Sequence, residues 1–192
     1  MRALCIAFVL MQLSACATIV EKKPHTELSI ASNAAKVSEL KEWGILGRVS
    51  IKQPHQAWLA SIEWAHNKKL DEVVISSSLS GTLASIRYSD HRIVVKTSEG
   101  TRQLKNVEEM QQVIGFNPPV PYLKYWVRGL PVPNVGLIKD GGSIKEGRTF
   151  KQEGWLVKLH RYQLVGDVWL PHKISVVGDE LNIKLAIEHW LP

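Results

Sequence analysis

Short stretches of alternating apolar and polar residues constrain the fold of this chain more than any other feature. Within 43–52, Ile45, Gly47, Val49 and Ile51 all fall on one face of an extended backbone. The same period of two, bounded by Gly, Ser, Asp and Pro turn signals, returns at 58–64, 72–77, 83–88, 92–97, 155–162, 168–177 and 181–188. Because parallel strands need long crossover connections, this succession of strands predicts an antiparallel sheet.

A few short helical patterns interrupt the strands. Apolar residues at helical spacing predict a helix over 33–42. Asn106 is suited to cap a second helix that Gly115 ends, and Pro121 and Gly129 bound a third. This order predicts a mainly β fold, an unclosed antiparallel β-barrel or strongly curved sheet. The short helices are expected to cover its concave apolar cavity.

Length and composition fit one globular domain. The chain has 192 residues, of which 45% are hydrophobic and 22% charged, with a net charge of +6. This composition excludes a disordered chain and a disulfide scaffold, and no stretch reaches the roughly 18–20 apolar residues of a membrane-spanning helix. We expect a lipoprotein signal peptide at 1–15, a lipidated N-terminus and flexible tether at 16–32, and a single domain at 33–192.

The first sixteen residues carry an export signal. A positive start is followed by an apolar segment over 3–13 that is too short to span a bilayer but suits a signal peptide. Residues 13–16 (LSAC) resemble the lipobox of bacterial lipoproteins, in which the thiolate of Cys16 would accept the lipid. Ala17 stands where an Asp would signal inner-membrane retention, so we expect export to the outer membrane. The alternative is an ordinary secretory signal that happens to contain a cysteine.

The sequence offers little for catalysis or nucleic-acid binding. It lacks G-x-S-x-G, H-E-x-x-H, P-loop and C-x-x-C motifs, and its histidines have no metal-ligand spacing on one predicted helix. Residues 140–143 (DGGS) predict a tight turn rather than a nucleophile site, and Glu108-Glu109 fit a helix start. We therefore expect no enzyme, no metal, no cofactor and no nucleic acid, and we expect a monomer.

The apolar residues are the more informative set. Seven Trp accompany many Leu, Ile and Val, and a strongly curved sheet under short helices encloses more apolar wall than they can fill. Rigid aromatic walls are typical of an apolar ligand site, although a large ordinary core would use the same residues. Leu79 stands alone among small polar residues at 76–82, which suggests an exposed finger; a singly exposed surface leucine is the alternative.

Several motifs in their order resemble the LolB family of outer-membrane lipoprotein receptors. After the lipobox come Trp43 with 47–49 (GRV), then Trp64 and the Leu79 loop. The most specific segment is 121–131 (PYLKYWVRGLP), followed by 152–157 (QEGWLV), Tyr162, Leu170-Pro171 and Trp190. The family often has Pro-Leu-Gly at the finger loop, where this chain has Ser78-Leu79-Ser80.

The resemblance implies an outer-membrane lipoprotein, anchored at Cys16 on the periplasmic face of a Gram-negative bacterium. It would accept lipoproteins from the periplasmic carrier LolA through an acyl-chain cavity and incorporate them into the outer membrane. The resemblance assigns Trp64, Leu123, Trp126 and Trp155 to this cavity and gives Leu79 the role of a membrane-insertion finger. The rivals are a structural outer-membrane lipoprotein with no acyl-binding cavity and a lipid-modifying enzyme.

Overall fold

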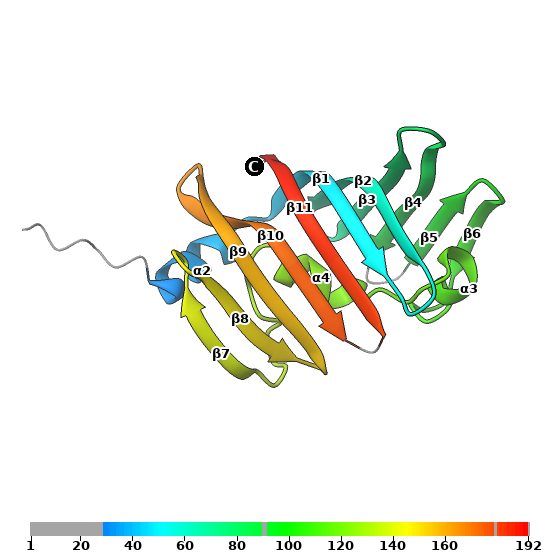
Figure 1. Cartoon of the computed structure of the whole chain (residues 1–192). Helices are drawn as coiled ribbons and strands as arrows, with labels where there is room; N and C mark the ends of the chain where they lie inside the picture. Colours follow the sequence, from blue (N-terminus) through cyan, green and yellow to red (C-terminus); the bar gives the residue numbers. More distant parts are fainter. Residues whose placement is uncertain (1–28, 90–91, 179, 192) are drawn as a thin grey trace, which may run out of the picture.

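The computed structural model describes residues 29–89, 92–178 and 180–191, and one antiparallel sheet of 11 strands dominates them (Figure 1). The strand order is β6-β5-β4-β3-β2-β1-β11-β10-β9-β8-β7, and the edge strands β6 and β7 are not paired with each other. The prediction of an unclosed antiparallel sheet is therefore confirmed. The strands are β1 (Glu42–Lys52), β2 (Ala57–Asn67), β3 (Leu70–Ser77), β4 (Gly81–Ser89), β5 (Arg92–Thr97), β6 (Gly100–Leu104), β7 (Ile138–Ser143), β8 (Gly147–Gln152), β9 (Trp155–Val165), β10 (Val168–Gly178) and β11 (Leu181–Leu191).

Alternation along the central strands gives the sheet one buried face. In β1, Ile45, Val49 and Ile51 are buried while Arg48 is exposed, as the period of two predicts. Val49 pairs with Leu185 of β11, so the first and last strands along the chain meet in the middle of the sheet. The apolar side chains of β1 and β11 lie on the same buried face of the sheet. This burial fixes the register, because a one-residue slip would turn every apolar side chain of the slipped strand to water.

Within the described residues, three short helices lie on the concave face: α2 (Ile30–Ser38), α3 (Met110–Ile114) and α4 (Val120–Trp126). In Figure 1, α4 crosses behind β10 and β11, α3 lies beside β5 and β6, and α2 lies by β9 and β10. Gly115 ends α3 in the left-handed conformation with φ 82°, as predicted. Asn106 Oδ1 accepts a hydrogen bond from the Glu109 amide at 3.1 Å, although the α-helix begins only at Met110.

Some element boundaries differ from the sequence prediction. The helix expected at 33–42 runs from Ile30 to Ser38, and Asn33 anchors it by hydrogen bonds with both backbone groups of Trp169, each 2.8 Å long. The expected turn at Gly141 and Gly142 lies inside β7, and the chain turns after Ser143 instead.

The core divides along the sheet. The main cluster covers the concave side of β1, β2 and β8–β11 and includes Trp43, Trp64, Trp126 and Phe150. A smaller cluster lies under β4–β6 with α3 and includes Met110 and Val120. No helix among the described residues has the length and apolar character that a membrane crossing would require.

Candidate functional site

Two neighbouring apolar hollows lie where the core clusters meet. The larger has a volume of about 310 Å³ and the smaller about 70 Å³. Both are bounded by the concave faces of β1–β4 and by the segment from α3 to α4, and their linings share Val49, Ile51, Ile75, Ile114 and Phe116. The two hollows therefore lie side by side and share part of their walls.

The two hollows differ in polarity. The smaller is lined by apolar side chains with one tyrosine, Tyr88. The larger is bordered at one place by Thr97 at the end of β5 and by Ser98 and Glu99, which form the turn between β5 and β6. Such a site can accept an apolar chain in its interior while the polar end of the ligand stays near the turn.

Trp64 and Leu123 are the two predicted cavity residues that line a hollow, and both belong to the smaller one. The Trp64 indole Nε1 donates a hydrogen bond of 2.8 Å to Asp71 Oδ1, and the same oxygen lies 2.9 Å from His66 Nδ1. Asp71 is 2% exposed. This buried carboxylate satisfies the polar end of the indole, so the ring can present an apolar wall to the hollow.

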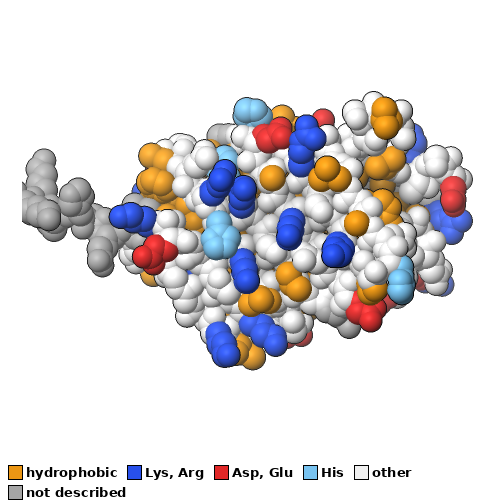
Figure 2. Space-filling view, viewed as in Figure 1, with side chains coloured by type: hydrophobic (Ala, Val, Ile, Leu, Met, Phe, Trp, Pro, Cys, Tyr) orange, Lys and Arg blue, Asp and Glu red, His pale blue; other side chains and the backbone are white. Residues whose placement is uncertain are grey.

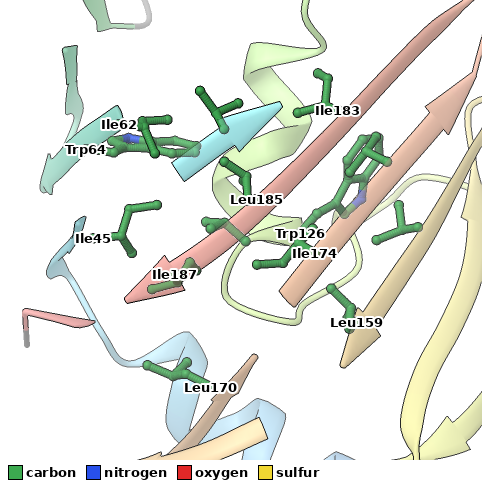
Figure 3. Packing of buried hydrophobic residues seen from close by; sticks show 14 of the residues in the cluster. Ile45, Ile62, Trp64, Trp126, Leu159, Leu170, Ile174, Ile183, Leu185 and Ile187 are labelled. Atoms are coloured by element: carbon green, nitrogen blue, oxygen red, sulfur yellow. The ribbon is translucent and has the colours of Figure 1, made fainter. Parts of the chain in front are cut away.

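Trp126 and Trp155 lie elsewhere, in the solid part of the core. Figure 3 shows Trp64 and Trp126 on opposite sides of the β11 row that runs through Ile183, Leu185 and Ile187. Trp126 is fully buried, its Nε1 donates to Gln152 Oε1 at 3.1 Å, and its ring lies 6.4 Å from that of Trp155. Neither tryptophan lines the two hollows, so their assignment to the cavity stays a prediction.

Leu79 is the most exposed large apolar residue of the described chain, at 95%. It lies in the turn between β3 and β4, where its backbone amide donates to Ser77 Oγ and Gly81 adopts φ 67°. The position agrees with the expected exposed finger, whose function stays a prediction. Cys16 and the signal peptide lie outside the described residues.

Residues 113–116 form a wall of the larger hollow that the sequence prediction missed. Val113 and Ile114 come from α3, and the Phe116 ring lies 5.8 Å from the ring of Trp58. The sequence does show a run of apolar residues at the end of this short helix. That run could not identify a cavity wall, because the same residues also fit ordinary core packing.

Arg128 connects helices α2 and α4 beside the site. Its guanidinium is almost buried, donates to the Leu40 carbonyl at 3.2 Å and lies 5.7 Å from the Trp43 ring centroid. Burial lowers the pKa of Arg128, whereas the charges of Tyr125 and Asp71 act in the opposite direction. With its further bonds to the carbonyls of Val37 and Lys124, Arg128 ties α2 to α4.

Across 29–89, 92–178 and 180–191, no cluster of three or more His, Cys, Asp or Glu residues could hold a metal ion. The site offers an apolar volume with a fixed indole wall. An apolar volume of this kind is suited to an apolar group.

Comparisons with known proteins decide the family. The profile described as outer membrane lipoprotein LolB matches residues 41–190. The chain belongs to the LolB family. An outer-membrane lipoprotein LolB from Coxiella burnetii is 28% identical over 198 residues, covering 97% of this chain and 92% of the relative. A second LolB, from Pseudomonas paraeruginosa, is 27% identical and covers 82% of this chain and 78% of its own length.

The fold comparison agrees with the LolB assignment. A crystal structure of a LolA superfamily protein from Nitrosomonas europaea has a TM-score of 0.50 at 7% identity, covering 84% of this chain and 92% of the other. At that identity the likeness shows the shared curved-sheet fold alone. As a LolB family member the chain is an outer-membrane lipoprotein with a role in lipoprotein sorting, and the predicted family and localisation are confirmed.

Proposed function

We propose that the chain accepts lipoproteins from the periplasmic carrier LolA, takes their acyl chains into the hollows beside Trp64, and incorporates them into the outer membrane. The observation that carries the proposal is the apolar volume bounded by β1–β4 and residues 113–123. A solid core would serve a scaffold equally well, whereas an unfilled apolar volume costs stability and favours a ligand-binding role.

Burial of acyl chains explains why such a receiver needs a cavity. Exposing a C16 chain to water costs about 13 kcal/mol at roughly 0.8 kcal/mol per CH₂ group. Free diffusion of a lipoprotein through the periplasm would therefore be negligible, and the chains must move from one apolar site to another. Transfer can be driven by affinity alone, because each 1.4 kcal/mol in favour of the receiver changes occupancy about tenfold.

The small size of the larger hollow favours a cover that moves when a chain enters. Its 310 Å³ is at the lower end of the range for ligand pockets, roughly 300–1,000 Å³. Helix α3 has only five residues and no side-chain hydrogen bond at its N-cap, so few hydrogen bonds hold it in the helical form. Outward movement of α3 and Phe116 would enlarge the hollow. A larger shift of α4 would bring the predicted residues Trp126 and Trp155 into contact with the ligand.

Cys16 and Leu79 complete the proposed cycle. Lipid on the Cys16 thiol would hold the chain at the outer membrane, where two or more acyl chains give stable anchoring. Leu79, exposed at the tip of the β3–β4 turn, would enter the bilayer during release of the cargo.

The hollow can be tested by filling it. Ala60 is buried on β2 and lines the larger hollow, whereas Ala65 on the same strand is exposed. We expect Ala60→Phe to reduce binding of a fluorescent fatty-acid analogue at least about tenfold, because the ring would occupy the ligand volume. Ala65→Phe is the matched control and should bind like wild type. Absence of probe binding to the folded wild type would favour the structural-lipoprotein alternative.

A further inference from the structure

The outer face of the sheet, opposite the helices, carries a concentration of positive charge. Figure 2 shows Lys and Arg side chains gathered over this face, with few acidic ones among them. Outward positions on β8–β11 and β1 are occupied by Lys151, Lys158, Lys173, Lys184, Arg48 and Lys52. In the described part of these strands the acids on the same face are Glu188, which pairs with Arg48 at 3.3 Å, and Glu42 at the start of β1.

Strand register arranges these cations in two adjacent rows. In one row, Ser175 of β10 lies directly between Lys158 of β9 and Lys184 of β11, and Lys184 in turn pairs with Ser50 of β1. In the next row, Lys173 lies between His160 and Ala186, and Ala186 pairs with Arg48. Long cationic side chains therefore alternate with serines and an alanine across the sheet.

This alternation leaves a hollow on the outer face. Its volume is about 400 Å³, and its lining includes Arg48, Ser50, His160, Lys173, Ser175 and Lys184. Lys173 and Lys184 are exposed and form no ion pair with any other described residue. A depression with a cationic rim and serine hydroxyls in its lining offers both charge and hydrogen bonds to a phosphate group.

We propose that this basic outer face binds the phosphate headgroups of anionic phospholipids and so orients the protein on the membrane surface. The residue composition of this face favours a membrane over a protein as its partner. Lys, Ser and Ala are depleted in protein interfaces, where aromatic residues and Arg are enriched. Lysines near an anionic bilayer, by contrast, each strengthen binding on the order of fivefold through electrostatic attraction.

The proposed anchor places a membrane within reach of this face. Residues 17–29 separate Cys16 from α2, and an extended segment of that length spans at most about 45 Å. Helix α2 is attached to β10 through Asn33 and Trp169, next to the strands that carry the patch. This step rests on the proposed anchor at Cys16, but binding of the face to lipid does not require the anchor.

The test uses a chain that begins at residue 17, since all described helices and strands lie between residues 30 and 191. Its sedimentation with phosphatidylcholine vesicles is compared with that on vesicles containing about one third phosphatidylglycerol. We expect binding only to the anionic vesicles, with affinity falling as salt is raised. Lys173→Glu combined with Lys184→Glu should weaken that binding at least about tenfold.

A matched charge change elsewhere provides the control. Lys96 and Lys105 are exposed outside the patch, and Lys96→Glu with Lys105→Glu alters the net charge equally. Equal losses in both pairs, or equal binding to both vesicle types, would overturn the proposal. The proposal would also be overturned if the Lys173→Glu, Lys184→Glu variant kept its vesicle affinity and lost only transfer from LolA. That result would show that the face binds a protein.

Acyl-probe binding by the same variants separates the two proposals. If the patch variant binds the fatty-acid analogue normally but loses the vesicles, the outer face is a membrane site independent of the cavity. If wild type binds anionic vesicles but no acyl probe, the proposed acyl-accepting function fails while the membrane site stands.

Discussion

Gln152 joins three parts of the core through a single buried amide. Its Oε1 accepts hydrogen bonds from Trp126 Nε1 and the Val132 amide, and its Nε2 donates to the carbonyls of Val132 and Val135. The side chain is fully buried, so nothing else can satisfy these groups if it is removed. The polar network explains why a glutamine occupies a position surrounded by apolar residues.

Replacement of this amide should be costly. We expect Gln152→Leu to lower the free energy of unfolding by about 3 kcal/mol, because it leaves buried donors and acceptors unpaired. Urea denaturation measures the loss. The exposed Gln103 on β6 supplies the control, since Gln103→Leu should change stability by less than about 0.5 kcal/mol. Equal effects of the two substitutions would contradict the role of the network.

Tyr162 makes stability sensitive to alkaline pH. Burial raises its pKa to about 12, a rise that Arg148 opposes and Asp140 reinforces. The neutral phenol is favoured in the folded chain, so its contribution is complete below the unfolded pKa near 10 and is lost as the pH rises toward 12. Between these limits wild type should lose about 2 kcal/mol more than Tyr162→Phe, measured by urea denaturation at each pH. Parallel pH profiles of the two proteins would contradict this assignment.

Leu79 should matter for membrane insertion and not for folding. Because its side chain is 95% exposed, Leu79→Glu is expected to leave the free energy of unfolding within about 0.5 kcal/mol of wild type. It should slow the incorporation of a lipoprotein into vesicles, since a carboxylate opposes entry into the bilayer. Leu164→Glu, at another exposed leucine, is the control. Unchanged insertion by Leu79→Glu would remove the finger role.

At the scale of elements, the contact between β1 and β11 depends on one glycine. The register shifts between Leu46 and Gly47, and a Cβ at Gly47 would lie 2.2 Å from the Ala186 carbonyl oxygen. The backbone at Ala186 cannot move away from such a Cβ without separating β1 from β11, the two strands that join the halves of the sheet. Gly47 is therefore required by close approach rather than by an unusual dihedral angle.

Gly47→Ala should consequently destabilise the protein by about 2–3 kcal/mol, the cost of overpacking against backbone. Gly136 offers the comparison, because a Cβ there meets nothing within 4 Å. Chemical denaturation should show a clear loss for Gly47→Ala and little change for Gly136→Ala. If both variants were as stable as wild type, the close contact between β1 and β11 would be refuted.

The elements that the sequence predicted well are those that bury one face. The alternation in β1 and β2 and the glycine stop at Gly115 were sufficient because each follows from local chemistry. Strand β6 was missed because four of its five residues are exposed, so no alternation marks it. In β7, Gly141 and Gly142 gave a turn signal, whereas Gly142 lies so close to Gly147 that the pairing leaves no room for a side chain.

At the scale of the whole molecule, the sheet supports two different interiors. Around β8–β11, Trp126, Trp155 and the Gln152 network fill the space, while β1–β4 retain the hollows beside Trp64. Sequence spacing could place a tryptophan on the concave side but could not show which half of the sheet is filled. That distinction depends on where α3 and α4 cross the sheet, which is set by contacts between distant segments.

Transfer from the carrier tests the central claim most directly. A purified complex of LolA with a lipoprotein would be mixed with the chain that begins at residue 17, and the lipoprotein that co-purifies with each variant would be measured. The account predicts transfer to wild type and to Ala65→Phe, and little transfer to Ala60→Phe, because only the last substitution fills the hollow. Failure of the folded wild type to take the lipoprotein, or equal transfer to Ala60→Phe, would contradict it.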